Sequence, residues 1–332
     1  MHKFQNKIIC DDCLKVLPLI EKGSVDLVFA DPPFNIGYKY DNYHDQMKRE
    51  KYLRWTEQWM SECKRVLKPN GSFYIAIGDT YAANVKIIAD DLRLFMRNWI
   101  IWHYTFGQQM KKKFSRSHTH IFYLVKNAKK FTFHDDTLRI ISDRQWVYKD
   151  KRANREGKTP DDVWDEYPRL CGTFKERLKF PCQMPEGLLA RIIRLSSNKD
   201  DWVLDPFSGS GTTAVVAHKL NRVYTGIEIS EKYVKQAKER LKKSKGLPVE
   251  GEGRPKWPEH ADKELIWLYH ENKVPDGQLR KNPMLLSLFT AKLNDRLRKI
   301  QHYTADEVAN QLEKLRKAGK LGPLHGEKIV RS

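Results

Sequence analysis

The chain lacks the features that mark membrane-inserted and secreted proteins. No run of about 18 apolar residues occurs in it, and its amino terminus has no apolar signal-peptide segment. We therefore expect a cytoplasmic protein. The five cysteines are odd in number and scattered, and Cys10 and Cys13 have no second pair at zinc-finger spacing. Ordinary reduced thiols are expected, with neither disulfides nor a metal site.

Acidic residues are scarce relative to basic ones, 42 against 61, so the formal net charge of the 332-residue chain is +19. Such a surplus of positive charge attracts polyanions, and in their absence the positive side chains repel one another. Nucleic acid is the favoured partner, and an anionic membrane surface comes second. The eleven histidines show no metal-ligand spacing, and we expect no metal ion.

Apolar, β-branched runs alternate with stretches of helical period along residues 1–134 and 180–245. This pattern is typical of an α/β fold with a mainly parallel sheet flanked by helices. We expect strands at 7–10, 25–30, 72–77, 98–104, 120–125, 201–204 and 222–227. We expect helices at 53–67, 185–195, 212–220 and 231–243, and residues 68–71 should stop the first of them.

Two segments lie outside this pattern. Residues 135–179 are polar and charged with little periodicity, which is typical of an insertion on a surface. A linker at 246–258, rich in glycine, proline and charge, precedes a tail at 259–332 with helical patterns. We expect that tail to be a small C-terminal helical module that either binds DNA or dimerises.

The first motif, Asp31-Pro32-Pro33-Phe34, follows the strand expected at 25–30. An exocyclic amine on a base is a poor nucleophile because its lone pair is delocalised into the ring. A carboxylate and a carbonyl that accept both amino hydrogens favour the tetrahedral nitrogen that attacks a methyl group. Asp31 and the carbonyl of Pro32 fit these roles, and Phe34 can stack on a base outside the duplex. A rigid turn without chemistry is the alternative.

The second motif, Asp-Pro-Phe-Ser-Gly-Ser-Gly-Thr at 205–212, follows an expected strand and opens an expected helix. Its glycines would let a ligand approach the backbone near the helix amino terminus. Gly209, Gly211 and Ala214 also match the dinucleotide fingerprint, and Glu228 ends the next strand, where a ribose-binding acid is expected. Spacing alone therefore permits NAD, another adenosine-containing cofactor or a structural turn.

The combination of the two motifs, in this order, resembles the β class of amino methyltransferases, in which the catalytic half precedes the half that binds S-adenosylmethionine. The resemblance covers residues 1 to about 245. Supporting segments in the family's order are Asp12-Cys13-Leu14, Lys68-Pro69-Asn70-Gly71-Ser72, Gln183-x-Pro185 and Gly226-Ile227-Glu228. The resemblance implies a Rossmann-like methyltransferase fold and direct methyl transfer to an extruded base of duplex DNA.

The resemblance also implies roles for individual residues. The target amine and base would be held by Asp31, Pro32 and Phe34. The implied cofactor-binding residues are Asp12, Asp31, Phe207, Gly209, Gly211, Thr212 and Glu228. Aspartate at position 31, where other members have serine, usually marks adenine N6 targets, so adenine is favoured over cytosine N4. The chain departs from the family at Met184, where a lysine is usual.

Residues 111–118, Lys-Lys-Lys-Phe-Ser-Arg-Ser-His, contain an aromatic side chain among basic ones and no acid. Such a loop can contact phosphates and fill the gap left by an extruded base, or it can be a solvated loop. The resemblance places the target-recognition region at 135–179. The DNA-binding residues that we predict are Lys111, Lys112, Lys113, Arg116, Ser117, Arg144, Arg152 and Arg155.

Three alternatives to an adenine methyltransferase stay open. They are a cytosine N4 methyltransferase, a catalytically silent DNA-binding subunit, and an NAD-dependent oxidoreductase, which would leave Asp31 and the charge unexplained. Besides double-stranded DNA, the resemblance leaves a homodimer and a cognate restriction nuclease open as partners. It implies a place at the nucleoid, in the cytoplasm.

Overall fold

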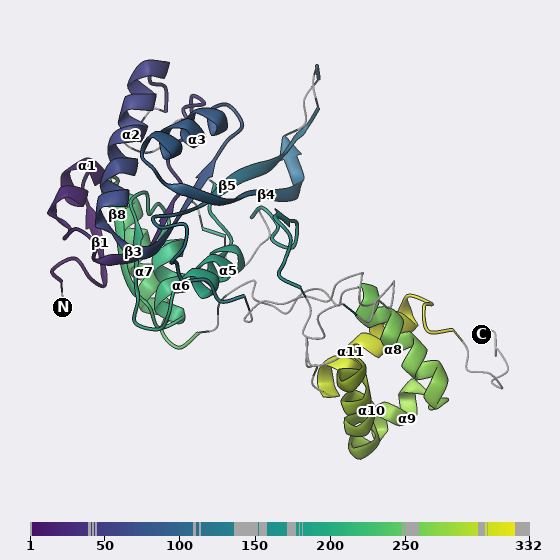
Figure 1. Ribbon diagram of the computed structural model, residues 1–332. Helices are drawn as coiled ribbons and strands as arrows, with labels where there is room; N and C mark the ends of the chain where they lie inside the picture. Colours follow the sequence, from purple (N-terminus) through teal and green to yellow (C-terminus); the bar gives the residue numbers. More distant parts are fainter. Residues whose placement is uncertain are drawn as a thin grey trace. The chain divides into compact units, whose positions relative to one another are not determined.

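The structure is a computed structural model (Figure 1). It describes residues 2–38, 41, 43, 45–108, 111–112, 114–135, 152, 158–170, 177–178, 180, 182–247, 249, 259–297, 303 and 305–322. The chain divides into two compact units. The first comprises Met1–Thr137 and Asp161–Gly253, and the second comprises Leu138–Pro160 and Arg254–Ser332.

The first unit is built on a sheet of eight strands among the described residues. In spatial order these are β1 (Lys7–Cys10), β8 (Val223–Glu228), β7 (Trp202–Asp205), β2 (Val25–Ala30), β3 (Leu67–Ile77), β5 (Arg116–Val125), β4 (Phe95–Gln108) and β6 (Val163–Trp164). From β1 to β3 all neighbours are parallel, whereas β5 is antiparallel to both β3 and β4. The predicted α/β class with a mainly parallel sheet is confirmed.

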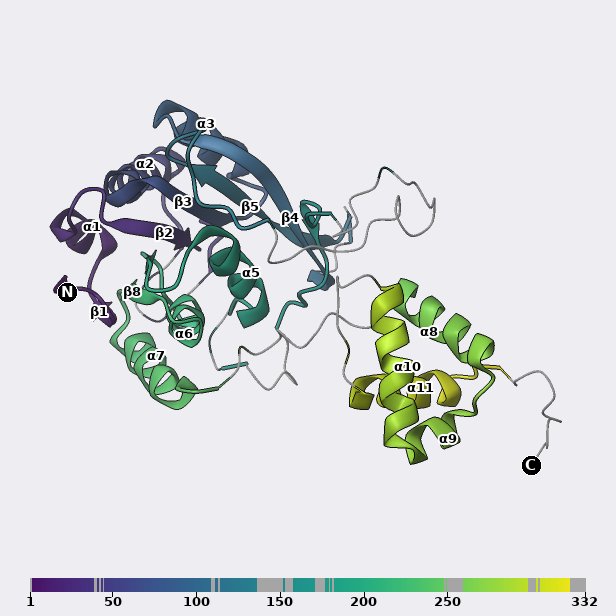
Figure 2. The ribbon, with the colours of Figure 1, turned by 60° about the horizontal axis from the view of Figure 1, so that its bottom comes forward.

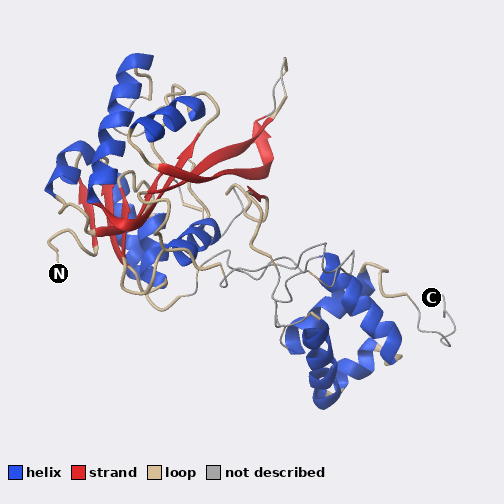
Figure 3. Ribbon diagram, viewed as in Figure 1, coloured by secondary structure: helices blue, strands red, loops and turns tan. Residues whose placement is uncertain are grey.

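Helices cover both faces of this sheet (Figures 2 and 3). They are α1 (Cys13–Val16), the 3-10 turn η1 (Leu17–Leu19), α2 (Arg49–Val66) and α3 (Ala82–Asp91) on one face, with α5 (Glu186–Ser196) and α6 (Thr212–Lys219) on the other and α7 (Glu231–Ser244) beside α6 and β1. Val28 of β2 packs toward α2, while Leu27 and Phe29 pack toward α5. Because β2 is buried on both faces, its sequence is apolar nearly throughout.

Two sequence expectations differ from the structure. Helix α2 ends at Val66 and β3 begins at Leu67, so residues 68–71 belong to the strand. A register shift absorbs the extra residues, since Val25 pairs with Leu67 but Leu27 pairs with Ser72. The segment 135–179 is also not wholly a surface insertion. Its residues Val163–Trp164 form β6, and buried Trp164 joins the core because β6 pairs with β4.

The second unit holds a core of its own. It contains α8 (Glu259–Asn272), α9 (Asp276–Lys281), α10 (Pro283–Arg296) and α11 (Ala305–Lys317). Leu265, Phe289 and Leu312 are among the apolar side chains that these helices bury. The predicted C-terminal helical module is therefore present, and α9 is an addition to it. In the part of the chain that the structure describes, no helix has the length and apolar character needed to cross a membrane.

Candidate active site

The two motifs lie on neighbouring strands at one edge of the sheet. β2 and β7 are parallel, with Val28 opposite Leu204, so Asp31 and Asp205 both stand at carboxyl ends. β8 and β1 continue the same parallel set, which brings Glu228 to this edge as well. The carboxyl edge of an open α/β sheet is where such folds bind ligands. The structure thus brings together motifs that are 170 or more residues apart in sequence.

The Asp31 corner is held by contacts from outside it. The Tyr52 hydroxyl donates a hydrogen bond of 2.7 Å to the carbonyl of Pro33. The buried Asp45 carboxylate accepts from the backbone nitrogens of Asn35 at 2.7 Å and Ile36 at 3.0 Å. These bonds fix the chain on the far side of the motif. Together with the two prolines, they hold the backbone of the turn that carries Asp31.

The acceptors of this corner are unsatisfied. Among the described residues, none donates a hydrogen bond to the Asp31 carboxylate or to the carbonyl of Pro32. Burial, and secondarily the charge of Asp205, raises the pKa of Asp31 to about 8. The Phe34 ring lies against the backbone of Gly78, where a Cβ atom would be 3.0 Å from it. Two free acceptors beside an aromatic ring suit a base with an exocyclic amine.

In the second corner, the Asp205 carboxylate already accepts hydrogen bonds from nearby residues. The Asp205 carboxylate accepts from the Phe207 nitrogen at 2.9 Å and from the Thr213 hydroxyl at 2.6 Å. Burial raises the pKa of Asp205 to about 7, against the effect of these bonds. Gly211 has a φ of 75° at the start of α6, and a Cβ there would lie 2.6 Å from that of Ala237. Only glycine fits this position, as the loop motif predicts.

The Glu228 carboxylate ties the glycine loop to the next strand. It accepts from the backbone nitrogens of Gly209 and Ser230, each at 2.9 Å. Burial raises the pKa of Glu228. Each of its oxygens keeps a second lone pair, so the carboxylate can still accept from a ligand hydroxyl. Gly209 itself adopts a φ of 48°, and its backbone is approached by the Phe180 ring.

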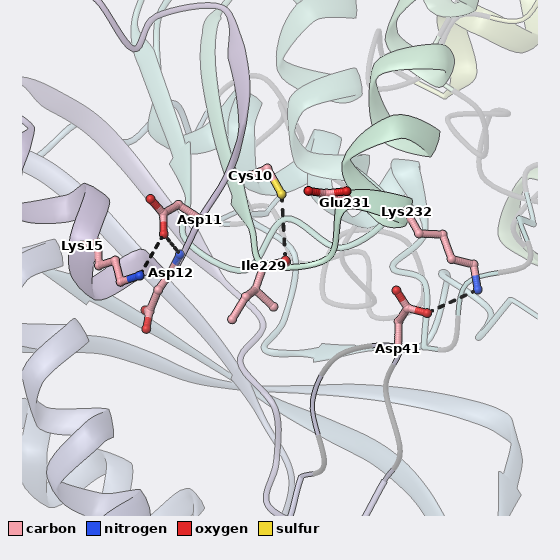
Figure 4. Close-up of a pocket in the computed structure, with 8 residues that line it drawn as sticks. All are labelled: Cys10, Asp11, Asp12, Lys15, Asp41, Ile229, Glu231 and Lys232. Carbon is pink, nitrogen blue, oxygen red and sulfur yellow. Dashed lines mark hydrogen bonds and ion pairs between the residues drawn. The ribbon is translucent and has the colours of Figure 1, made fainter.

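A cavity of about 630 Å³ lies where β1 and β8 end. Figure 4 shows its lining, which consists of Cys10, Asp11, Asp12, Lys15, Asp41, Ile229, Glu231 and Lys232. Asp12 caps α1 by accepting from the Leu14 nitrogen at 2.9 Å. The carboxylates of the cavity can accept hydrogen bonds from a ligand, and the exposed side chain of Ile229 can pack against an apolar ring. These groups fit the adenosine part of a cofactor.

Two of the predicted cofactor residues have their side chains engaged by the protein. The Phe207 ring packs against Trp55 and Trp59 of α2, with ring centroids 5.5 and 5.1 Å apart. The buried Thr212 hydroxyl accepts a 2.8 Å hydrogen bond from Arg240. These side chains therefore hold the loop in place. A ligand would contact the backbone of the loop.

Sequence reasoning missed a buried ionic network beside this loop. Glu186 at the start of α5 accepts from Arg240 of α7 at 2.7 Å and from Lys219 of α6 at 2.8 Å. The side chains of Glu186 and Lys219 are only 3% and 4% exposed. Because Arg240 also donates to Thr212, the network fastens three helices to the glycine loop. The available sequence signal was Glu186, an acid in the first turn of a helix whose other residues are mostly apolar.

The predicted DNA-binding residues are placed only in part. Lys111 and Lys112 are exposed in the connection between β4 and β5, and Arg152 is exposed as well. Arg116 and Ser117 belong to strand β5, and Arg116 forms an ion pair of 3.0 Å with Asp79. Since Ile77 pairs with His120, residues 116–119 lie beyond the carboxyl end of β3. The remaining three, Lys113, Arg144 and Arg155, lie outside the described residues.

Comparison with known proteins identifies the family. The sequence model of the family described as DNA methylase matches residues 25–239, which hold both motifs. The chain belongs to this family. The type II methyltransferase M.HpaI of Haemophilus parainfluenzae is 40% identical over 236 residues, covering 71% of this chain and 74% of the relative. The DNA adenine methyltransferase YhdJ of Escherichia coli K12 is 39% identical over 244 residues, covering 70% and 82%.

Solved structures share the fold of this DNA methylase. The PvuII DNA methyltransferase, described as cytosine-N4-specific, aligns with a TM-score of 0.55 and 19% identity over 70% of this chain and 85% of its own. A DNA modification methylase of Thermus thermophilus, TTHA0409, aligns with a TM-score of 0.53 and 22% identity over 73% and 97%. The predicted Rossmann-like methyltransferase fold is confirmed. The predicted class, S-adenosylmethionine-dependent DNA amino-methyltransferases, is confirmed by the family match and the relatives.

Proposed function

We propose that this DNA methylase transfers a methyl group from S-adenosylmethionine to the N6 nitrogen of adenine at a specific site in duplex DNA. The observation that carries the proposal is a pair of acceptors, the Asp31 carboxylate and the Pro32 carbonyl, to which no described residue donates and which directly follow the strand next to β7 and its glycine loop. Aspartate at position 31 and the 39% identity to an enzyme named as a DNA adenine methyltransferase both favour adenine.

The catalytic corner acts on the amine of an extruded base. Asp31 and the Pro32 carbonyl accept its two hydrogens, which localises the nitrogen lone pair, while Phe34 stacks on the ring. Bound S-adenosylmethionine would supply an electrophilic methyl group, and the base nitrogen would take that methyl as its bond to sulfur breaks. The nitrogen then loses a proton, and the Asp31 carboxylate, with its pKa near 8, is placed to accept it. No covalent intermediate with the enzyme is needed.

The cofactor half positions the donor. Glu228 would accept hydrogen bonds from the ribose hydroxyls, Asp12 would bind the adenine side, and the backbone of Gly209 to Gly211 would hold the methionine side. The cavity at the ends of β1 and β8, which Asp12 lines, supports the place of the adenosine part, and the hydrogen bond from Gly209 to Glu228 puts the glycine loop beside the end of β8. Phe207 and Thr212 contribute by holding the loop, as their packing against α2 and their bond to Arg240 suggest.

The remaining assignments concern DNA and partners. Lys111, Lys112, Lys113, Arg116 and Ser117 contact the duplex beside the extruded base, and the region 135–179, with Arg144, Arg152 and Arg155, recognises the target sequence. The module at 259–332 is an accessory to residues 1–134 and 180–245. A DNA substrate puts the enzyme at the nucleoid, in the cytoplasm. A homodimer and a cognate restriction nuclease stay predictions, and analytical ultracentrifugation of the purified chain tests the first.

The direct test is analysis of the product. Purified protein is incubated with methyl-labelled S-adenosylmethionine and duplex DNA of mixed sequence, and the DNA is digested to nucleosides and separated by mass. Label in N6-methyladenine is expected, and mapping the labelled positions gives the recognition sequence. Label in N4-methylcytosine would replace adenine by cytosine as the target. Cofactor binding without any labelled base would point to a silent subunit.

A further inference from the structure

An arginine from the segment 135–179 reaches the edge of the catalytic pocket. Arg169 is half-buried, and its guanidinium carbon lies 5.8 Å from the centroid of the Tyr104 ring. Burial, and secondarily the charge of Asp31, raises the pKa of the Cys182 thiol, whereas Arg169 lowers it, so the thiol lies near both charged groups. Cys182 is therefore a neighbour of both Arg169 and the catalytic carboxylate.

The charge of Arg169 has no acidic partner among the described residues. The arginines around it differ in this respect. Arg191 pairs with Glu166 at 2.8 Å, and Arg116 pairs with Asp79 at 3.0 Å. A half-buried guanidinium that packs on an aromatic face loses hydration, and a stacked, planar fork of donors is well suited to a phosphate. Its surroundings thus favour an anion brought by the substrate.

The position of Arg169 indicates which anion. Strand β4 continues past His103, which pairs with His118 of β5, and so reaches beyond the carboxyl end of β3, where Ile77 pairs with His120. Arg169, which packs on Tyr104 of β4, therefore lies at the carboxyl edge of the sheet, the edge that also carries Asp31. When an amine is bound at Asp31, the sugar and phosphate of the same nucleotide extend away from it. A phosphate is therefore the anion that a bound nucleotide would bring to this edge.

We propose that Arg169 binds a backbone phosphate of the extruded nucleotide and so holds its base against Asp31. This rests on the proposed function, because it needs a flipped nucleotide in the pocket. Arg169 is then a positioning residue, since it touches the phosphate and not the reacting atoms. The Tyr104 ring packs against the guanidinium and limits its movement.

The experiment pairs Arg169→Gln with Arg97→Gln as a matched control. Arg97 also places its guanidinium over an aromatic ring, 4.7 Å from the centroid of Phe131, but it lies near the start of β4, at the opposite edge of the sheet. Each variant removes one charge and one cation–π contact. Binding to a duplex with the mapped recognition sequence is measured against salt concentration, with the natural backbone and with a neutral methylphosphonate on either side of the target nucleotide.

For Arg169→Gln we expect the slope of log K against log salt to fall by about 0.9, the value for one phosphate contact. We expect kcat/KM for DNA to fall about 10- to 100-fold, as for removal of a charged hydrogen bond. One methylphosphonate should weaken binding by the wild-type enzyme equally and have no further effect on Arg169→Gln. Arg97→Gln should keep the slope, and Arg169→Lys should retain it with a reduced kcat/KM.

Additive effects of Arg169→Gln and every methylphosphonate would overturn the proposal, as would an unchanged salt slope. Thermal unfolding and cofactor titration check that the variant is intact. If Arg169→Gln does not fold, the methylphosphonate scan is compared between the wild type and Arg169→Lys, and insensitivity of the wild type to both positions overturns the proposal. A wild-type enzyme that methylates no DNA contradicts the proposed function instead, so the two failures are distinguishable.

Discussion

Two Asp-Pro corners stand side by side at the carboxyl edge of the sheet, and they differ in how their carboxylates are used. Asp205 accepts hydrogen bonds from the Phe207 nitrogen and the Thr213 hydroxyl, whereas no described residue donates to Asp31. Both follow buried parallel strands, β7 and β2. The strand context is therefore the same, and the difference must come from the residues that follow each aspartate.

The third residue of each corner explains much of the difference. Phe207, two residues after Asp205, has the backbone N–H that caps the carboxylate. The corresponding residue after Asp31 is Pro33, which has no N–H to donate. The second proline thus does more than stiffen the turn, because it removes the local donor that would occupy Asp31. The Asp205 corner therefore stabilises the fold, whereas the Asp31 corner keeps its acceptors for a substrate.

The largest expected effect is on the rate of methyl transfer, and it comes from the Asp31 corner. Asp31→Asn should lower kcat by on the order of 10³-fold, because it replaces an acceptor that matters most as charge develops on the nitrogen. Thermal midpoint and cofactor affinity should be unchanged. Single-turnover transfer and calorimetric titration measure both quantities.

Asp205→Asn is the matched control, with the opposite pattern. The amide keeps only one of the two acceptor oxygens, so cofactor affinity and stability should fall before the chemical step does. Equal loss of folding in both variants would remove the distinction between the corners.

The second effect concerns the network behind the structural corner. Glu186→Gln leaves the buried cations Arg240 and Lys219 without their carboxylate, which should cost about 3–5 kcal/mol in the free energy of unfolding. Urea denaturation measures it. Glu62→Gln is the control, because its pair with Arg65 is partly exposed and should cost less than about 1 kcal/mol. A similar cost for both variants would show that the network does not hold the loop.

The third effect is a pH profile. The charged form of Asp31 is the acceptor, and its pKa is raised to about 8, so kcat/KM should rise about tenfold per pH unit below that value and level off above it. Pro33→Ala restores a backbone donor beside the carboxylate. That donor favours the charged form, so the midpoint of the profile should move to lower pH and kcat should fall several-fold. A midpoint that does not move would deny Pro33 this role.

The smallest effect lies on the DNA side. Replacing Lys111, Lys112 and Lys113 together with glutamine should reduce the salt slope of DNA binding by roughly 0.9 for each phosphate that these side chains neutralise in the wild type. The control replaces Lys242, Lys243 and Lys245, which are exposed at the end of α7. Because that end points to the opposite edge of the sheet, the control should keep the slope. Equal slopes in the two triple variants would mean that the Lys111 segment is only a solvated surface.

The sequence predicted the strands that carry the motifs better than the contacts between distant segments. β1 and β2 have the predicted bounds, because a continuous apolar run ending at a polar corner has few other structures. Helix α3 and strand β6 were not predicted, since one is amphipathic only weakly and the other owes its existence to pairing with β4. The ionic network of Glu186 and the position of Arg169 depend on tertiary packing, which periodicity does not contain.

The most direct measurement is a crystal structure of the protein with an inert cofactor analogue and a duplex that carries the mapped methylation site. The account predicts an extruded adenine whose N6 atom lies about 3 Å from both the Asp31 carboxylate and the Pro32 carbonyl. Asp205 should keep its bonds to Phe207 and Thr213. An amine bound away from Asp31, or a target base left in the duplex, would contradict it.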